Sequence, residues 1–272
     1  MSEKSDNLNE AKHDECCGGE QAVRQPVAVC LFSYKLLSVS EMFFSNSELW
    51  SFFSNTRLNK IAAYPPEIAN SLEPDRRLYA LEQSMAAELA VCAAMKKCGR
   101  GFKPPNYGCK ANGQPTISGG FVSISHTLGY AVCAIAKQPT GVDVERRRAF
   151  CNAVKKRILS ENETELLKNA PDLNEALLQI WTAKESFLKM TGEGIAGGMQ
   201  NLELTPSGRK PSGVFTVNRV ADGTAGYIST IRIEDGGLAG AEAYLSVCTA
   251  EKTSLSITHF DSIEKILTYL KD

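Results

Sequence analysis

Two segments of the chain carry acidic residues at different periods, and this pair constrains the fold more than any other feature. In Gly141-Val142-Asp143-Val144-Glu145 apolar and acidic residues alternate, which is the period of a β-strand. One face of such a strand enters a core, while both carboxylates project from the other face. Residues 174–191 instead have helical spacing, and Gly192 ends the helix. The chain therefore combines strands and helices around one strand with an acidic face.

The helix carries a single row of large and charged side chains. Trp181, Glu185 and Lys189 are spaced four residues apart, so they lie on one face. If this face meets the strand, the carboxylates of Asp143, Glu145 and Glu185 converge beside an ammonium group. Three oxygen ligands suit a hard cation such as Mg2+, which shares its shell with waters and substrate phosphates. Each segment alone also fits a plainer interpretation, a half-solvated strand and a surface ion pair.

The overall composition excludes several classes of protein. The 272 residues are 43% hydrophobic and 22% charged, and a formal net charge of −1 gives no field for nucleic acid or anionic membranes. No apolar run approaches the length of a membrane span, and the N-terminus is unlike a signal peptide. With three histidines and no Cys-x-x-Cys pair, a zinc site is not expected. The nine cysteines indicate reduced, mostly buried thiols in a cytoplasmic protein.

Taken together, the two segments match a known pattern. Gly-Val-Asp-Val-Glu at 141–145, followed by Trp-x-x-Lys-Glu-Ser-x-x-Lys at 181–189, resembles the signature of the 4'-phosphopantetheinyl transferase superfamily. The separation of Asp143 from Glu185 is similar to that in the larger, two-lobed members, the Sfp type. The resemblance implies an α+β fold of two similar lobes related by a pseudo-twofold axis. Each lobe would be a small, mostly antiparallel sheet packed on a long helix.

On this basis the chain divides into three parts. Residues 1–25 are polar and aperiodic, and we predict a disordered tail. The tail contains Cys16-Cys17, whose role the sequence leaves open. The N-terminal lobe is expected at 26–140 and the C-terminal lobe at 141–272, with the active site in the cleft between them.

Two helices are predicted in the N-terminal lobe. The first runs from Glu48 to Ala63 and has an apolar inner face. The second begins at Asp75 and continues to about Lys97, with a row of apolar residues along one side. Arg76 and Arg77 open this second helix. In the family an Arg near this helix start reaches coenzyme A, and the sequence does not decide which of the two corresponds.

Three closely spaced strands are predicted, and the acidic strand is the third of them. Phe121–Ser125, Tyr130–Ala136 and Gly141–Glu145 are separated by short turns, so an antiparallel meander is predicted. In a meander the first and third strands run in the same direction. Their C-terminal ends therefore lie at one edge of the sheet, which brings Ser125-His126 toward Glu145.

The resemblance implies that coenzyme A is held by basic and polar side chains from both lobes. The expected set is Arg57, Lys60, Arg77, Ser125, His126, Lys184 and Lys189. Arg57 and Lys60 correspond to contacts with the 3'-phosphate. Ser125-His126 resembles the family's Ser-His, which binds the ribose phosphate and adenine end. A solvated helix face is an equally simple interpretation of Arg57 and Lys60.

At two positions the chain departs from the family pattern. Glu88 stands where the family often has a further Arg. Asn112-Gly113-Gln114-Pro115 resembles the family's Gly-Lys-Pro, but Gln114 replaces the Lys. A neutral amide can still donate to a phosphate, although one charge-assisted contact is lost, and Lys110 is a candidate substitute.

The resemblance implies a transfer reaction. Coenzyme A would give its 4'-phosphopantetheine arm to a serine of an apo acyl or peptidyl carrier protein, releasing 3',5'-ADP. Mg2+ on Asp143, Glu145 and Glu185 would neutralise charge on the leaving phosphate. Glu185 would act as the base, directly or through a water, and Lys189 would stabilise or protonate the leaving group.

Two other functions remain open at this point. One is a different Mg2+-dependent enzyme that cleaves a nucleotide pyrophosphate, and the other is a non-catalytic module that binds coenzyme A or a carrier. We expect a cytoplasmic monomer that binds no nucleic acid and no membrane. The sequence does not indicate whether the carrier serves fatty acid, polyketide or peptide synthesis.

Overall fold

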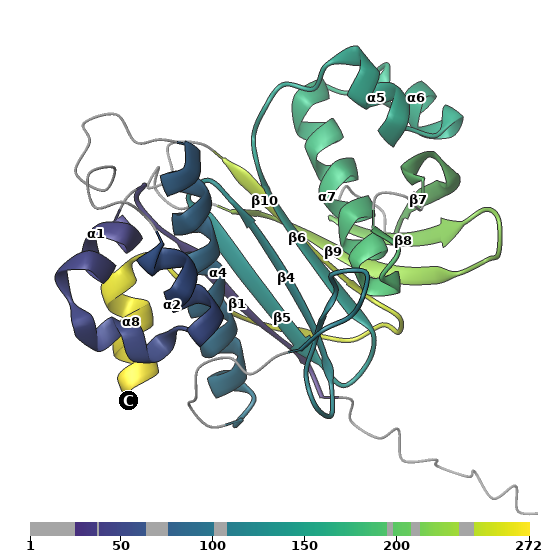
Figure 1. The fold of residues 1–272 in the computed structure, drawn as a ribbon. Helices are drawn as coiled ribbons and strands as arrows, with labels where there is room; N and C mark the ends of the chain where they lie inside the picture. The colour runs from purple at the N-terminus through teal and green to yellow at the C-terminus, as the bar shows by residue number, and fades with distance from the viewer. Residues whose placement is uncertain are drawn as a thin grey trace, which may run out of the picture.

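The computed structural model describes residues 25–36, 38–63, 76–100, 108–194, 198–207, 213–233 and 242–272. Two larger sheets, one two-stranded ribbon and several helices make up this part of the chain, so the predicted α+β class is confirmed (Figure 1). The predicted disordered tail lies outside the described residues, apart from Gln25. No described helix is both long and apolar enough to cross a membrane.

The first sheet has the strand order β11-β1-β5-β4. Its strands are β1 (Val27–Ser33), β4 (Phe121–Thr127), β5 (Tyr130–Ala136) and β11 (Leu255–Phe260). Both β1 and β5 are buried along their whole length, because their continuous apolar runs are covered on both faces. The hairpin predicted between β4 and β5 is present, and Gly129 supplies the positive φ of 84° that its tight turn requires.

A long helix, α4 (Arg76–Lys97), covers one face of this sheet. The predicted apolar row on this helix is buried in the first core cluster, together with residues of β1 and β5. Leu81, Met85, Leu89 and Cys92 of this row belong to the cluster, and Leu78 of the same row is also buried. The seven cysteines within the described residues are all free, and four of them are buried. That finding agrees with the expectation of reduced thiols.

The second sheet has the order β6-β10-β9-β8-β7 and packs against the other long helix, α7 (Leu173–Thr191). Its strands are β6 (Thr140–Arg146), β7 (Leu202–Pro206), β8 (Val214–Arg219), β9 (Ala225–Ile233) and β10 (Ala243–Thr249). Asp172 caps the N-terminus of α7, and Gly192 ends the helix with a φ of 79°. The predicted helix end at Gly192 is therefore confirmed.

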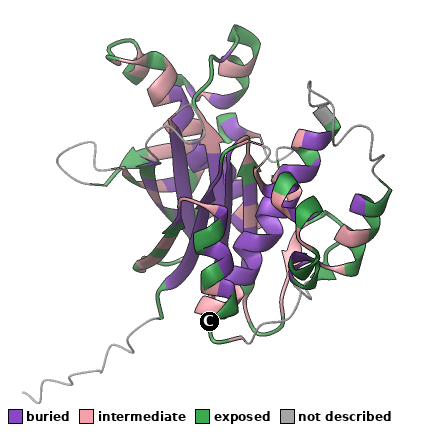
Figure 2. Cartoon of the chain, turned by 90° about the vertical axis from the view of Figure 1, so that its left-hand side faces the viewer, coloured by how far each residue is buried: buried purple, intermediate pink, exposed green. Residues whose placement is uncertain are grey.

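The two sheets share a core of their own. Side chains of β1 and β5 meet side chains of β6 and β10 in a cluster that contains Val29, Val132, Val142, Val144 and Leu245. The central strands are consequently the most buried part of the molecule, with the helices outside them (Figure 2). Because Val142 and Val144 point into this cluster, the intervening Asp143 points to the opposite face, toward α7.

The remaining described elements are short. They are α1 (Ser38–Ser45), η1 (Ser47–Phe52), α2 (Asn55–Ala62), α5 (Asn152–Ile158), α6 (Glu161–Leu167), η3 (Met199–Asn201), α8 (Ile263–Lys271), β2 (Gly108–Cys109) and β3 (Pro115–Thr116). Residues 48–63, predicted as one helix, form η1 and α2 instead. Ser54 interrupts the helix because its hydroxyl accepts a hydrogen bond from the backbone N–H of Arg57 and so begins a new one.

The predicted three-stranded meander is wrong in its third strand. β6 pairs with β10 in the second sheet and not with β5. The reason is that β5 already has β1 on one edge and β4 on the other, so no edge is left for a further strand. β4 and β6 nevertheless meet, since the N–H of Val142 donates to Ser123 Oγ at 3.0 Å.

The predicted C-terminal lobe, 141–272, does not hold its last two elements. β11 pairs in parallel with β1 and so completes the first sheet. α8 buries Ile263, Ile266 and Leu270 in the core cluster beneath α4. Without β11, β1 would expose an unpaired edge, and the C-terminal segment covers it. The division into lobes at 140 and 141 otherwise stays a prediction.

Candidate functional site

The centre of the site is a hydrogen-bonded cluster of three side chains from β4, β6 and α7. Lys189 Nζ donates to Asp143 Oδ1 at 2.7 Å and to Ser125 Oγ at 2.8 Å. Ser125 Oγ in turn donates to the same Asp143 oxygen at 2.7 Å. Asp143 is buried, whereas the side chain of Lys189 keeps 29% of its surface exposed. The expected approach of Ser125 to the acidic strand is therefore present, although β4 and β6 belong to different sheets.

Glu185 lies one helical turn before Lys189 and is also buried. Burial, together with the nearby carboxylates of Asp143 and Glu145, raises the pKa of Glu185 to about 7, and Lys189 opposes the shift. Three carboxylates are thus electrostatically coupled on facing parts of β6 and α7. A glutamate that titrates near neutrality can exchange a proton at the working pH of an enzyme.

Glu145 is the least enclosed of the three carboxylates. Its Oε1 forms an ion pair with Arg148 Nη2 at 2.9 Å. Burial raises its pKa, Arg148 counteracts the shift, and Asp143 adds to it. The sequence analysis did not assign Arg148 any role, although its place three residues after Glu145 is a usable signal.

The fit of a divalent cation can be judged from the carboxylate oxygens. Asp143 Oδ2 and Glu185 Oε1 are both buried and have no hydrogen-bond partner within the described residues. Buried oxygens without a partner are costly, and a cation would satisfy them. No described group of three His, Cys, Asp or Glu side chains is gathered closely enough to hold a metal by itself. The donor set therefore fits an ion that keeps several waters, as Mg2+ does.

His126 follows Ser125 at the end of β4 and contacts the N-terminal helix layer. Its Nδ1 lies 3.2 Å from Oε1 of Gln83 on α4. Burial lowers the pKa of His126, and the positive charges of Lys189 and Arg57 lower it further. These three basic groups therefore share one neighbourhood. Gln83 was missed by sequence reasoning, because an isolated Gln on a helix gives no signal.

Arg57 on α2 is held by the residue that departs from the family pattern. Its Nε lies 3.6 Å from Oε2 of Glu88, and Glu88 Oε1 accepts a hydrogen bond from Ser54 Oγ at 2.6 Å. Glu88 is buried, which raises its pKa. Lys60 and Arg77 lie exposed on α2 and α4. The side chain of Arg76 lies outside the described residues.

Lys184 does not reach the site, and the structure contradicts the predicted contact with a phosphate oxygen. Its ammonium is fully buried and donates to Glu163 Oε2 at 2.6 Å and to the carbonyls of Ile158 and Met199 at 2.8 and 3.0 Å. Consecutive helix residues point about 100° apart, so Lys184 turns away from β6 while Glu185 faces it. Lys184 instead joins α7 to the capping box that begins α6.

Gln114 is likewise engaged with the protein. Its Nε2 donates to the carbonyl of Lys189 at 3.0 Å, and its Oε1 accepts from Lys110 Nζ at 2.7 Å. Nearby, Asn112 Nδ2 donates to the carbonyl of Gly192 at 2.6 Å. The ribbon of β2 and β3 therefore docks on the C-terminal end of α7, where it satisfies carbonyls that the helix leaves unpaired. A cavity of about 230 Å³ lies between this ribbon, β4 and Lys189.

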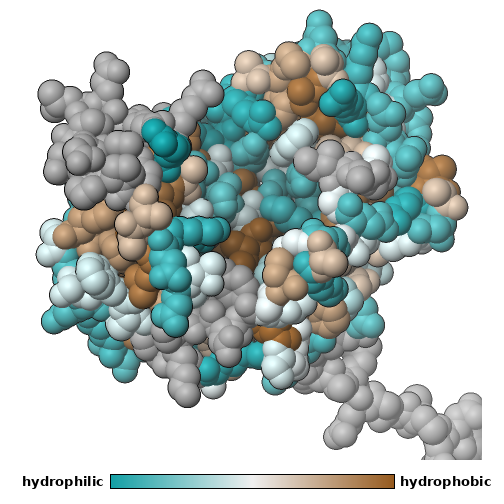
Figure 3. All heavy atoms as spheres, in the orientation of Figure 1, coloured by the Kyte–Doolittle hydropathy of each residue, from teal (hydrophilic) through white to brown (hydrophobic). Residues whose placement is uncertain are grey.

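Trp181 packs outside the cluster. Its ring lies 5.9 Å from that of Phe150, and the Arg148 guanidinium sits 5.2 Å from the centre of the indole ring. Trp181 therefore packs against the segment that follows β6. Seen from the same side as Figure 1, the surface is hollowed between the N-terminal helices and α7, with hydrophilic side chains along its walls (Figure 3).

Comparison with known proteins covers the segment that carries Asp143, Glu185 and Lys189. Residues 139–235 match the family model of the 4'-phosphopantetheinyl transferase superfamily. This part of the chain is therefore similar to that superfamily. Similar proteins include the 4'-phosphopantetheinyl transferase Sfp of Bacillus subtilis, 30% identical over 30% of this chain and 38% of Sfp. The resemblance to the larger, Sfp-type class that the motif spacing indicated is thereby confirmed.

Two further relatives belong to the same superfamily. The 4'-phosphopantetheinyl transferase psf-1 of Bacillus pumilus is 29% identical over 46% of this chain and 49% of its own length. HetI of Nostoc sp. is 32% identical over 36% of this chain and 44% of its own length. The chain thus spans less than half the length of each of these three relatives. The crystal structure of Thermotoga maritima holo-[acyl-carrier-protein] synthase is 23% identical with a TM-score of 0.32, covering 42% of this chain and 64% of that one.

Proposed function

We propose that this protein transfers the 4'-phosphopantetheine arm of coenzyme A to a serine hydroxyl of an apo acyl or peptidyl carrier protein. The other product is 3',5'-ADP. The observation that carries the proposal is the cluster of Lys189, Ser125 and Asp143 beside a buried Glu185 that titrates near neutrality. Every member lies in one of the two motifs that resemble the superfamily signature or in the Ser125-His126 pair on β4.

Asp143 and Glu185, with Glu145 once it releases Arg148, are the residues that would hold Mg2+. The ion, when bound, would neutralise negative charge on the pyrophosphate of coenzyme A. Two buried carboxylate oxygens without partners support this assignment. The unsatisfied oxygens belong to Asp143 and Glu185, so we infer that these two contribute more to metal affinity than Glu145 does.

Glu185 is the proposed base for the carrier serine. A base must be unprotonated at working pH and still hold the proton it accepts, so a pKa near 7 is well matched to the task. Deprotonated Glu185 would accept the serine proton directly or through one water. Its position one turn from Lys189 sets the base and the cation on the same face of α7.

Lys189 is the proposed contact for the phosphate that leaves. Its ammonium has three N–H groups, of which Asp143 and Ser125 accept two. The third N–H and the exposed part of the side chain would be directed to a phosphate oxygen. Arg57 and His126, which lie near Lys189, would bind the 3'-phosphate and nucleotide end of coenzyme A. The exposed Lys60 and Arg77 would add further positive charge there.

The carrier protein and coenzyme A are thus the proposed partners. We place the protein in the cytoplasm as a monomer, in keeping with seven free cysteines in the described part of the chain. Two rival functions remain as outcomes of the test. They are pyrophosphate cleavage without a protein acceptor and binding without catalysis.

Mass spectrometry of an apo carrier protein incubated with coenzyme A, Mg2+ and this protein tests the proposal. We expect the carrier to gain one phosphopantetheine, and we expect no gain with a carrier whose acceptor serine is changed to Ala. Glu185→Gln is the matched control for the enzyme, because it keeps the size of the side chain and removes the base. Nucleotide cleavage with an unmodified carrier would favour the first rival, and binding alone would favour the second.

A further inference from the structure

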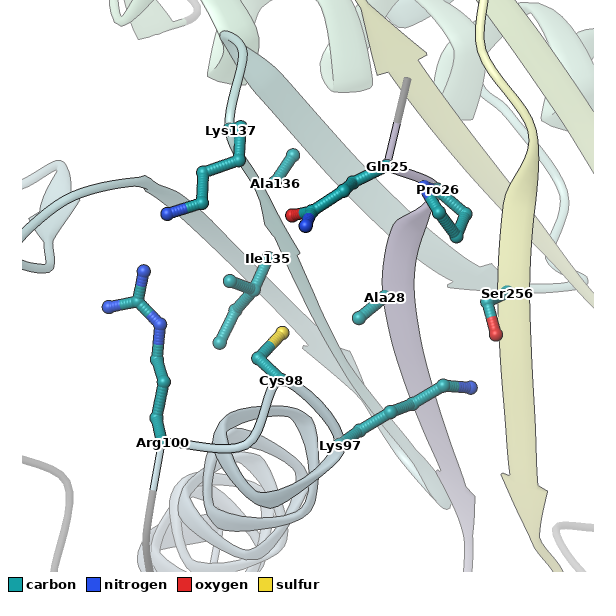
Figure 4. Close-up of a pocket in the computed structure, with 10 residues that line it drawn as sticks. All are labelled: Gln25, Pro26, Ala28, Lys97, Cys98, Arg100, Ile135, Ala136, Lys137 and Ser256. Atoms are coloured by element: carbon teal, nitrogen blue, oxygen red, sulfur yellow. The ribbon is translucent and has the colours of Figure 1, made fainter. Parts of the chain in front are cut away.

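A cavity of about 370 Å³ lies at the end of the first sheet that is remote from the candidate site (Figure 4). The site uses the C-terminal end of β4, whereas this cavity uses the C-terminal end of the antiparallel β5. Its lining residues are Gln25, Pro26, Ala28, Lys97, Cys98, Arg100, Ile135, Ala136, Lys137 and Ser256. Nothing in the proposed function uses these residues.

The lining is strongly basic. Lys97 is the last residue of α4, Arg100 follows three residues later, and Lys137 follows β5. Among the described residues that line the cavity, none is acidic. Positive side chains gathered in a recess with no carboxylate raise the local concentration of anions.

Two of these cations are brought together by one turn. Arg100 donates to the carbonyl of Ser118 at 2.6 Å and to the carbonyl of Gly119 at 3.0 Å. Lys137 Nζ donates to the same Gly119 carbonyl at 3.1 Å. A carbonyl is neutral, and within the described ranges neither cation has an ion-pair partner. Two like charges fixed side by side without a counter-charge favour an anion between or above them.

The third cation and a thiol complete the recess. Lys97 Nζ donates to Thr258 Oγ1 at 2.6 Å, which turns it toward β11. Cys98 lies between Lys97 and Arg100 in Figure 4, below Ala28 and Ile135. Burial raises the pKa of the Cys98 thiol, and Arg100, Lys97 and Lys137 all oppose that shift. All three positive charges therefore interact electrostatically with the Cys98 thiol.

We propose that this cavity binds a phosphate monoester, with the phosphate held by Arg100 and Lys137. Ala28 and Ile135 provide an apolar floor for a small organic part of the ligand. Arg100 is suited to the phosphate because its planar guanidinium retains N–H groups beyond the two that the turn carbonyls occupy. This site is independent of the proposed transferase activity.

A purely structural role offers a competing explanation. Basic residues near the C-terminus of α4 also stabilise the negative end of the helix dipole, and Arg100 and Lys137 fix the turn at 118–119. On that explanation the cavity would have no affinity for anions beyond ordinary ionic screening. The experiment must therefore separate specific phosphate binding from a general effect of salt.

Cys98 provides a local readout in the full-length, folded protein. Its alkylation by neutral iodoacetamide is followed by peptide mass spectrometry, with exposed Cys109 and Cys151 as internal references. We expect millimolar phenyl phosphate to slow the alkylation of Cys98 at least about threefold relative to chloride at equal ionic strength. Inorganic phosphate should slow this alkylation to a smaller extent. The references should not change. Equal effects of phosphate and chloride on Cys98 would overturn the proposal.

Two variants sharpen the test. Lys137→Gln removes one charge and only one hydrogen bond, so the fold should be retained and the protection of Cys98 should be largely lost. Lys265→Gln, on exposed α8, changes the net charge equally and should leave the protection unchanged. Arg100→Gln should abolish protection as well. If phenyl phosphate protects Cys98 in Lys137→Gln as well as in the unmodified protein, the assignment of the site is wrong.

Discussion

The two faces of α7 place nearly identical ion pairs in opposite roles. On one face Lys184 contacts Glu163 at 2.6 Å, and on the other Lys189 contacts Asp143 at 2.7 Å. Lys184 is fully buried, and three fixed acceptors take its three N–H groups. Lys189 is partly exposed and has two protein acceptors within the described residues. Spare hydrogen-bonding capacity next to solvent, not the presence of a lysine, is what makes one face suitable for a ligand.

The same comparison holds for the acidic residues. The carboxylate of Glu163 is satisfied by the ammonium of Lys184 and by the backbone N–H of its own capping box. Asp143 and Glu185 each keep one buried oxygen without a partner in the described part of the chain. Satisfied buried groups stabilise a fold, whereas unsatisfied ones mark a place where something binds.

Removing Asp143 should have the largest effect of all on activity. In Asp143→Asn the shape is kept, but Lys189 loses its charged partner and the proposed metal loses a ligand. We expect carrier modification to fall by at least about a hundredfold at saturating Mg2+. Circular dichroism should show a folded protein. Because Asp143 is buried, Asp143→Ala is the poorer variant, and loss of activity there could reflect unfolding. Retention of more than a few per cent of activity in Asp143→Asn would contradict the assignment.

Lys184→Met should destabilise the packing of α7 on the Lys184 side without changing the candidate site on the Lys189 side. The substitution leaves the Glu163 carboxylate buried without its cation, which typically costs about 3–5 kcal/mol in the free energy of unfolding. Urea denaturation measures this loss. The fraction that remains folded should modify the carrier at close to the normal specific rate. A stable but inactive Lys184→Met protein would mean that Lys184 acts on the substrate after all.

The raised pKa of Glu185 predicts two pH dependences. Activity should rise with pH and level off above about 7, because only the carboxylate can accept a proton. Stability of the metal-free protein should change in the opposite sense. The folded state holds the Glu185 proton more tightly than the unfolded state, so the contribution to stability is full below the ordinary glutamate pKa. It is lost as pH rises toward 7 and above, by about 1–3 kcal/mol.

Glu185→Gln should flatten the stability profile between pH 5 and 8, measured by urea denaturation in the presence of a chelator. Glu163→Gln is the control substitution, because Glu163 contacts Lys184 and lies away from the candidate site. If both variants keep the profile of the unmodified protein, Glu185 does not titrate near neutrality.

A smaller effect is expected at His126, whose proposed task is binding. His126→Ala should raise KM for coenzyme A about three- to tenfold and change kcat less. The unmodified protein should discriminate against 3'-dephospho-coenzyme A, and the variant should do so less. Gln83→Leu, which removes only the partner of His126 Nδ1, should give an intermediate result. Equal discrimination by all three proteins would show that His126 does not contact the 3'-phosphate.

The smallest change is expected for Gln114→Lys. The sequence suggested that a lysine here would tighten coenzyme A binding by restoring a charged contact. In the structure Gln114 donates to the Lys189 carbonyl and accepts from Lys110, so a lysine could replace the first bond but would repel Lys110. We now expect coenzyme A affinity to change by less than about twofold. Calorimetric titration at low and high salt measures this, and a clear gain at low salt would show that the loop reaches the nucleotide.

The sequence by itself determined the local elements of the site. Alternation in 141–145 placed Val142 and Val144 in a core and Asp143 on the opposite face, and the four-residue spacing placed Glu185 and Lys189 together on α7. The helix stop at Gly192 could be predicted in the same way. These features depend on periods and caps within one segment, which is why a linear pattern is enough to predict them.

Only the tertiary structure decided which segments became neighbours. β6 joined β10 because both edges of β5 were already taken, and β11 returned to cover the open edge of β1. The direction of Lys184 was fixed by where α6 and η3 pack, and that of Gln114 by the carbonyls at the end of α7. Strand edges, buried charges and helix ends are each satisfied by whichever distant partner is within reach. These long-range pairings depend on the tertiary structure, so no local residue pattern in the sequence predicts them.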